Sequence, residues 1–250
     1  MAMADPGDWF VVPRPRPDAR HRILLFPHAG GGANYYRAWA AHLPADVELR
    51  IVQYPGREHR MAEPLVPDMA TLAGAAADAV AGAAGPALPT TLVGHSMGAS
   101  VAYEVAHLLE DDFGARLVHL VVSGRSAPGS RIGQVPSRTD ALTDEELRAD
   151  LAGEGGTDPR LLDTPDVRAV IFPIVRNDYR LLRRYTARPV PLRCDVTAVV
   201  GDSDPWVPVH AARPWERCTT GRFRLHVQPG GHFYFRTRLA DTVRLLAERP

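Results

Sequence analysis

The sequence contains no lysine, and all 29 of its basic residues are therefore arginines. A Walker phosphate-binding loop needs a lysine beside the phosphates, and pyridoxal phosphate is attached through a lysine amine. The absence of lysine excludes both a nucleotide site of the Walker type and Schiff-base chemistry on a lysine.

Cysteine is also scarce, with only Cys194 and Cys218 in 250 residues. Two thiols make no disulfide framework, and neither H-E-x-x-H nor a paired C-x-x-C occurs. We therefore expect neither a metal nor a soluble cofactor.

Net charge and long apolar runs are missing as well. The 29 acidic residues balance the arginines, so no overall field would attract nucleic acid or an anionic membrane. No apolar run approaches the roughly 20 residues of a membrane span, and residues 1–22 lack the features of a signal peptide. We expect a cytoplasmic protein with no nucleic-acid or membrane partner.

Hydrophobic residues make up 45% of the chain and charged ones 23%, as in ordinary globular proteins. The length suits a single domain, 1–250, which follows an extended lead-in of about 20 residues. Short apolar runs predict strands at 22–27, 48–55, 90–94, 117–124, 195–201 and 223–228. Helical patterns lie at 35–43, 69–84, 97–109, 207–218 and 238–248. The alternation predicts an α/β fold with a mostly parallel central sheet and helices on both faces.

One region, about 128–190, interrupts this alternation with polar, Gly- and Pro-punctuated sequence and no convincing strand. Insertions at the active edge of a sheet commonly become lids, so we expect a helical lid insertion there. A long crossover with two or three helices is the alternative.

The stretch TLVGHSMGASVAYEVA, residues 91–106, passes from a strand pattern to a helix pattern at Ser96. Gly94 and Gly98 remove the Cβ atoms that would collide in so tight a turn, which lets Ser96 adopt a strained backbone. Such a G-x-S-x-G turn exposes the serine Oγ, and we interpret Ser96 as a nucleophile rather than part of a glycine-softened helix start.

A serine hydroxyl needs a base and a group that orients the base. The strand pattern at 195–201 runs into GDSDPWVP, and the pattern at 223–228 is followed by PGGHFYF. Successive parallel strands end at one edge of a sheet, so Asp202, Asp204 and His232 are expected at the same edge as Ser96. His232 is the predicted base. Asp204 is favoured over Asp202 as its partner; the alternative role for Asp204 is to cap the next helix.

FPHAGGGAN follows the first of these predicted strands. The backbone amides of Ala29 and Met97 are candidates for binding an oxyanion during acyl transfer. We expect His95 to be structural, because neighbouring side chains diverge in a sharp turn. A dinucleotide site is disfavoured: counted from Gly30, the third glycine of G-x-G-x-x-G would fall at Tyr35.

Five segments in this order, LLFPHAGGGANYY, QYPGREHR, LVGHSMGASVAYEVA, GDSDPWVP and PGGHFYF, resemble the stand-alone type II thioesterases of polyketide and nonribosomal peptide synthesis. These enzymes belong to the α/β-hydrolase superfamily. The resemblance spans about residues 21–246. It implies a nucleophile at Ser96, a base at His232, an acid at Asp204 and oxyanion amides at Ala29 and Met97.

The resemblance also implies acyl or peptidyl carrier domains as partners, whose phosphopantetheine arms such enzymes clear of aberrant acyl groups. Two other functions remain open. A small-molecule carboxylesterase would use the same triad, and a non-catalytic carrier-binding protein would keep the fold without the reaction.

Residues 166–185 form the longest helical pattern of the insertion. Val170, Ile171, Ile174 and Val175 are expected to face the core or an acyl channel. Arg180, Arg183 and Arg184 are candidates for contact with an acidic carrier surface, or else a solvated basic helix end.

Overall fold

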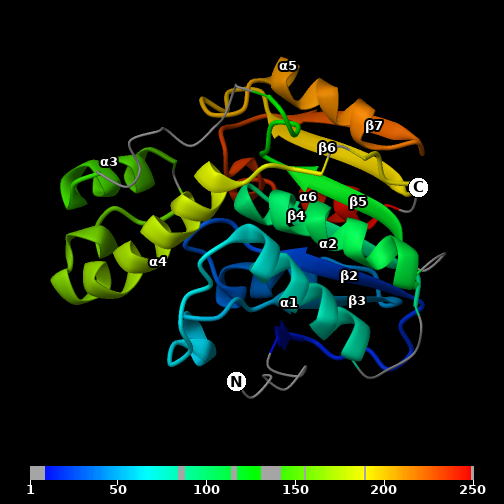
Figure 1. Ribbon diagram of the computed structural model, residues 1–250, viewed down its shortest axis with the longest axis horizontal. Helices are drawn as coiled ribbons and strands as arrows, with labels where there is room; N and C mark the ends of the chain where they lie inside the picture. The colour runs from blue at the N-terminus through cyan, green and yellow to red at the C-terminus, as the bar shows by residue number, and fades with distance from the viewer. Residues whose placement is uncertain are drawn as a thin grey trace.

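The computed structural model describes residues 9–83, 88–113, 117–130, 142–154, 156–188 and 190–248. In this part of the chain seven strands form one sheet, in the order β1-β3-β2-β4-β5-β6-β7 (Figure 1). All neighbouring strands are parallel except the edge strand β1, which runs antiparallel to β3. The order confirms the predicted α/β fold with a mostly parallel sheet.

The strands are β1 Phe10–Val11, β2 His21–Phe26, β3 Val47–Val52, β4 Thr90–His95, β5 Leu117–Ser123, β6 Asp195–Gly201 and β7 Phe223–Gln228. The α-helices are α1 Met69–Gly82, α2 Met97–Phe113, α3 Asp144–Glu154, α4 Pro165–Arg184, α5 Val209–Ala212 and α6 Leu239–Ala247. The 3₁₀ segments are η2 Ala33–Ala41, η3 Glu58–Arg60, η6 Leu161–Asp163, η7 Arg213–Cys218 and η8 Tyr234–Arg236.

Alternate residues of each central strand face opposite sides of the sheet and enter two separate cores. Leu24 and Phe26 of β2 pack with α1 and α2, whereas Ile23 and Leu25 pack with η2 and α6. Figure 1 shows α1 and α2 on one face of the sheet and α6 behind it. Because both faces are covered, the strands read as continuous apolar runs, and the six predicted strands all form.

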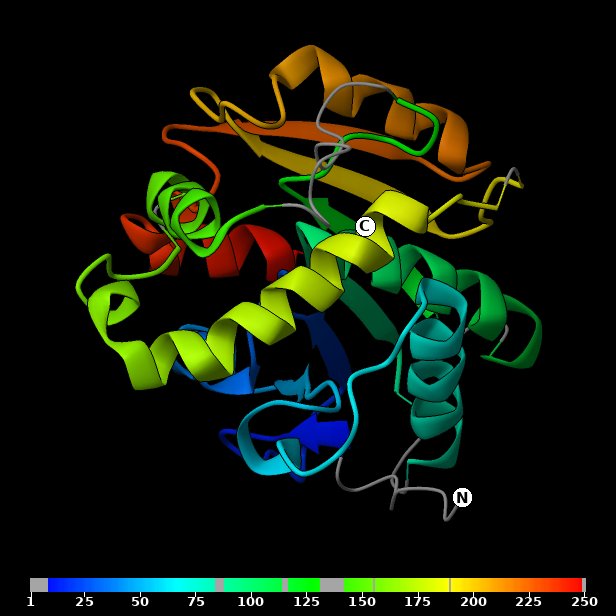
Figure 2. The same ribbon diagram turned by 60° about the vertical axis from the view of Figure 1, so that its left-hand side comes forward.

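Helices α3 and α4 leave the sheet between β5 and β6 and lie beyond one end of the strands (Figures 1 and 2). They share a small core of their own, formed by Leu147, Leu151, Leu162, Phe172, Val175 and Tyr179. We call residues 128–190 the inserted segment. Its residues 131–141, 155 and 189 lie outside the described part of the chain.

Three expectations need correction. The lead-in contributes strand β1, because residues 10–11 pair with the open edge of β3. The helix expected at 35–43 is a 3₁₀ segment, in which Ala33, Tyr36 and Trp39 are buried at every third position, the period of that helix. The helix expected at 207–218 divides into α5 and η7 next to Pro214, which has no amide hydrogen.

The pattern of α4 is confirmed except at Val170. Ile174 and Val175 are buried, and Ile171 is partly buried against the core of the inserted segment, but Val170 is 42% exposed. Val170 lies one turn before Ile174 on the same helix face. Periodicity identifies that face, but not how far along the helix other elements cover it.

Candidate active site

Ser96 lies in the single-residue turn between β4 and α2, with a backbone φ of 53°. This left-handed conformation is costly for a residue with a side chain, and it persists only where surrounding structure enforces it. The Ser96 amide donates to the Ser123 carbonyl at 2.8 Å, which ties the turn to the end of β5. The strained turn expected from the G-x-S-x-G spacing is therefore present.

Gly94 and Gly98 are required by close backbone contacts. A Cβ on Gly94 would collide with the backbone of Gly98 and Ala99, and one on Gly98 would collide with Phe26 and lie 2.7 Å from the Pro27 carbonyl. The start of α2 is thus pressed against both β4 and the loop that follows β2.

His232 and Asp204 meet at the ends of two further strands. His232 Nδ1 lies 2.8 Å from Asp204 Oδ2, and both residues are 5% exposed. The carboxylate favours a proton on Nδ1, which leaves Nε2 as the basic nitrogen of a neutral ring. The other oxygen, Asp204 Oδ1, accepts from the amides of Trp206 and Val207 at 2.9 and 3.1 Å. Asp204 therefore both orients the ring and caps the following turn.

Asp202 does not contact His232. Its Oδ1 accepts from the Gly230 amide at 2.9 Å, and its side chain is exposed. Of the two aspartates that the sequence placed after β6, Asp204 makes the contact with the imidazole.

The His232 ring reaches the neighbourhood of Ser96. Its centroid lies 4.9 Å from that of His95, the residue before Ser96. A Cβ on Gly124 would lie 2.8 Å from His95 Cε1 and 3.1 Å from His232 Cε1. Since Gly124 follows Ser123, which binds the Ser96 amide, the structure gathers these groups at the carboxyl edge of the sheet.

The two candidate oxyanion amides belong to the segments that Gly98 brings together. Met97 begins α2, and Ala29 lies two residues after Pro27, whose carbonyl faces Gly98. Within the described ranges, neither amide donates to another protein group. Both remain available to an oxygen of a ligand.

His95 and His28 are internal. His95 Nδ1 lies 2.9 Å from Ser123 Oγ, and His28 Nδ1 lies 2.6 Å from Tyr36 Oη. Burial, reinforced by His232, lowers the pKa of His28 to about 3 and holds the pKa of His95 well below its usual range. Both rings stay neutral near pH 7, which supports a structural role for His95.

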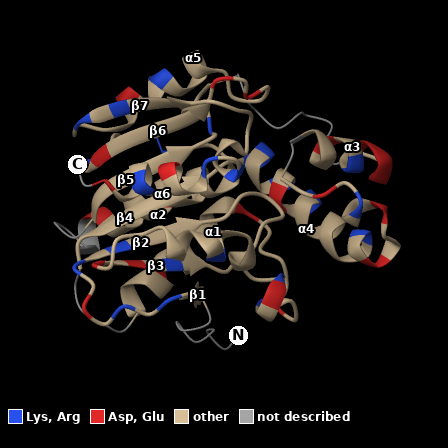
Figure 3. Cartoon of the chain, turned by 180° about the vertical axis from the view of Figure 1, so that it is seen from behind, with Lys and Arg blue, Asp and Glu red and all other residues tan. Residues whose placement is uncertain are grey.

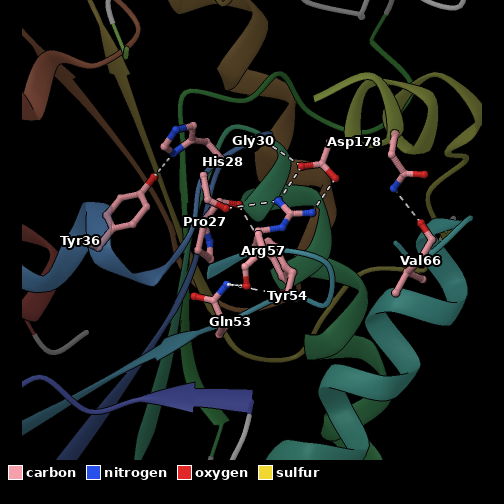
Figure 4. Close-up of polar contacts among 11 residues, drawn as sticks. Pro27, His28, Gly30, Tyr36, Gln53, Tyr54, Arg57, Val66 and Asp178 are labelled. Carbon is pink, nitrogen blue, oxygen red and sulfur yellow. Dashed lines mark hydrogen bonds and ion pairs between the residues drawn. The ribbon is translucent and has the colours of Figure 1, made fainter. Parts of the chain in front are cut away.

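Sequence reasoning assigned no role to Arg57 or Asp178. Their side chains form a buried ion pair beside Gly30, with Arg57 Nη1 2.7 Å from Asp178 Oδ2 (Figure 4). The QYPGREHR motif indicated that Arg57 is part of the family pattern, but the partner lies 121 residues away along the chain.

The described residues offer neither a metal site nor a membrane span. In those ranges no three His, Cys, Asp or Glu side chains cluster as metal ligands, and no helix combines the length and hydropathy needed to cross a bilayer.

Comparison with known proteins gives a consistent result. A family model for the thioesterase domain matches residues 21–248. The thioesterase PikA5 of Streptomyces venezuelae is 38% identical over 235 residues, covering 92% of this chain and 81% of its own length. Some other curated relatives are longer, and the match covers only 59% of the length of one of them and 11% of another.

Solved structures agree. The type II thioesterase BorB of the borrelidin biosynthetic cluster is 36% identical with a TM-score of 0.85, and 96% of each chain is covered. YbtT, a type II thioesterase of the yersiniabactin NRPS/PKS pathway, is 26% identical with a TM-score of 0.84, covering 95% of this chain and 96% of that chain. The motifs, the fold and these matches together place the chain in the thioesterase domain family, among relatives that include type II thioesterases.

Proposed function

We propose that this chain hydrolyses acyl thioesters on the phosphopantetheine arms of acyl or peptidyl carrier domains, with Ser96, His232 and Asp204 as its catalytic triad. The observation that carries the proposal is the buried His232–Asp204 hydrogen bond beside the strained Ser96 turn. Removal of aberrant acyl groups in polyketide or nonribosomal peptide synthesis, in the cytoplasm, is the role that best suits the family.

In the first half of the reaction, Ser96 Oγ attacks the thioester carbonyl while His232 Nε2 takes its proton. The amides of Ala29 and Met97 stabilise the oxyanion. The carbon–sulfur bond then breaks, and the His232 imidazolium protonates the departing thiolate. The products are a free pantetheine thiol and an acyl-Ser96 ester.

In the second half, His232 removes a proton from water, and the resulting hydroxide attacks the ester carbonyl. Collapse of this second tetrahedral intermediate releases a carboxylic acid and returns the proton to Ser96 Oγ. In this scheme the Asp204 carboxylate holds the ring and balances the charge of the imidazolium, and it takes no part in the proton transfers.

The inserted segment serves as the lid in this proposal. A Cβ on Gly30 would lie 2.6 Å from Val175 of α4, and a Cβ on Gly156 would lie 2.5 Å from the ring of Phe233, which follows His232. The segment therefore packs against the loops on both sides of the site, where it would control entry of the acyl group.

The direct test is mass spectrometry of a panel of acylated carrier domains before and after treatment with the enzyme. Loss of the acyl group from the pantetheine arm supports the proposal. Faster turnover of simple oxygen esters than of carrier thioesters would favour a carboxylesterase. Failure of a serine-directed fluorophosphonate to label Ser96 would favour a non-catalytic binding protein.

Activity is expected to fall on acidification, because a protonated imidazole cannot accept the Ser96 proton. His28 and His95 cannot produce a loss at mildly acidic pH, since their lowered pKa values keep both rings neutral there. His232→Ala should therefore abolish the acid limb of the pH–rate profile together with most activity, whereas His95→Ala should retain the limb. A wild-type limb in the residual turnover of His232→Ala would remove His232 from the mechanism.

Carrier docking is expected to involve the carboxyl end of α4, where Arg183 and Arg184 are exposed. Charges of both signs are spread over the chain, with acidic residues over much of α3 (Figure 3). Charge reversal, Arg183→Glu with Arg184→Glu, should lower kcat/KM for acyl carriers more than for a small acyl thioester.

The difference between the two substrates should shrink at high salt, because screening weakens contacts between exposed charges. Arg244→Glu, on the exposed side of α6, is a matched control that should affect neither substrate. Equal losses for both substrates would indicate damage to the inserted segment, and no loss would remove these arginines from docking.

A further inference from the structure

Residues 27–34 follow β2 and carry the Ala29 amide, and we call them the oxyanion loop. Side chains from elsewhere in the chain hold their backbone at five points (Figure 4 draws several of them). The contacts are Tyr54 Oη to the Pro27 carbonyl at 3.2 Å, the Gly30 amide to Asp178 Oδ2 at 2.8 Å, Arg57 Nη1 to the Gly31 carbonyl at 3.2 Å, the Ala33 amide to Gln53 Oε1 at 2.9 Å, and the Asn34 amide to Glu58 Oε1 at 3.0 Å.

Four of these five side chains belong to residues 53–58, the QYPGRE part of the family motif. This stretch follows β3, the neighbour of β2 in the sheet. The motif contributes no group to the proposed triad. Its polar side chains are instead directed at the backbone that presents one of the two oxyanion amides.

The fifth contact comes from the inserted segment. Asp178 of α4 is fully buried and accepts from the Gly30 amide and from both terminal nitrogens of Arg57, at 2.7 Å to Oδ2 and 2.9 Å to Oδ1. Arg57 itself is 4% exposed. The carboxylate thus bonds the oxyanion loop and the arginine that holds the next carbonyl of the same loop.

Gly30 packs closely against α4. Gly30 has a φ of +75°, and a Cβ there would lie 2.6 Å from Val175 Cγ2, one turn before Asp178 on α4. Ala29, the residue before Gly30, also packs against the core of the inserted segment. A displacement of α4 would therefore shift the peptide next to the Ala29 amide.

We infer that Arg57 and Asp178 are positioning residues, which hold the Ala29 amide where the oxyanion forms and so make transition-state stabilisation depend on the seating of α4. The inference rests on the proposed function. It assigns a task to the QYPGRE motif, and it means that the site is competent for chemistry only while α4 lies on the oxyanion loop.

A buried ion pair with only a structural role would make the same contacts, so the test separates transition-state binding from ground-state binding. Asp178→Asn keeps a hydrogen-bond acceptor but loses the charge. Arg57→Lys keeps the charge but loses the bidentate contact with the Asp178 carboxylate. Hydrolysis of an acyl-N-acetylcysteamine thioester gives kcat/KM without a carrier domain. A trifluoromethyl ketone of the same acyl chain reports binding of the tetrahedral adduct, and the unreactive thioether reports ground-state binding.

Each variant is expected to lower kcat/KM by about 10- to 100-fold, the scale of a small misplacement of one oxyanion donor. Binding of the trifluoromethyl ketone should weaken by the same factor, while binding of the thioether should change less than about twofold. The matched control is Glu48→Gln, which removes the charge from another buried carboxylate paired with an arginine. Glu48 of β3 lies 3.0 Å from Arg22 of β2, near the amino ends of both strands and outside both α4 and the oxyanion loop. This control should stay near wild type in all three measurements.

Unchanged affinity for the trifluoromethyl ketone, weaker thioether binding as the sole effect, or an equal loss in Glu48→Gln would each overturn the inference. If Asp178→Asn fails to fold, Arg57→Lys decides by the same criteria. Tyr54→Phe removes the uncharged hydrogen bond to the Pro27 carbonyl of the oxyanion loop. It is expected to lower kcat/KM and trifluoromethyl ketone affinity by a smaller factor. Wild-type thioester turnover by Ser96→Ala would instead overturn the proposed function, so the two failures are distinguishable.

Discussion

Ser96→Ala is expected to lower thioester turnover by roughly 10⁴-fold or more and to abolish the acyl-enzyme, because loss of the nucleophile leaves only the oxyanion amides and substrate binding. The fold should remain intact, since alanine occupies the same volume and the contact of the Ser96 amide with Ser123 is a backbone one. Steady-state kinetics and mass spectrometry of the trapped intermediate measure both effects.

Ser100→Ala is the matched control for this variant. Ser100 is a buried serine on α2, about one helical turn beyond Ser96. Its replacement should leave turnover close to wild type, and thermal unfolding should show both variants folded. Near-normal turnover by purified Ser96→Ala would remove Ser96 from the mechanism.

Asp204→Asn is expected to lower kcat by about 10⁴-fold, whereas Asp202→Asn should remain within a few-fold of wild type. An amide cannot stabilise the imidazolium as a carboxylate does, and its NH₂ group would favour the wrong tautomer of His232. The Oδ1 atom of asparagine can still accept from Trp206 and Val207, so the turn after β6 should persist.

The two variants can be compared directly because Asp202 lies on the same turn, while its side chain accepts from the Gly230 amide and not from His232. Kinetics on a small acyl thioester and near-UV circular dichroism should be measured for both proteins. The reverse ranking of the two kcat values would transfer the role of acid to Asp202.

Much of the fold follows from local patterns, because buried parallel strands leave continuous apolar runs. All six predicted strands form, and the turn at Ser96 is as strained as its glycines indicate. Strand β1 was missed because two residues on an exposed edge carry no periodic signal. The predicted triad, the oxyanion amides and the lid remain predictions, although the contact of His232 with Asp204 has the geometry that the first of them requires.

The ion pair of Arg57 and Asp178 could not be predicted from local sequence patterns. Two charged residues 121 positions apart read as surface residues in a single sequence, because most charged side chains are exposed. Both residues are buried in the folded chain, where α4 contacts the oxyanion loop. The pairing depends on tertiary structure, which hydrophobic periodicity does not encode.

The place where the inserted segment leaves the sheet bears on how such an enzyme can diversify. Strands β5 and β6 pair from His119 with Asp195 to Ser123 with Val199. The inserted segment that connects them therefore does not interrupt their pairing in the sheet. If the inserted segment acts as the proposed lid, mutations in α3 would alter which acyl chains are admitted while the strands beneath the proposed triad keep their register. Substitutions near Asp178 are expected to be less tolerated, since Asp178 bonds the Gly30 amide of the oxyanion loop. Divergence in substrate range is therefore expected to accumulate in α3 and the outer part of α4, with the Asp178 turn as its boundary.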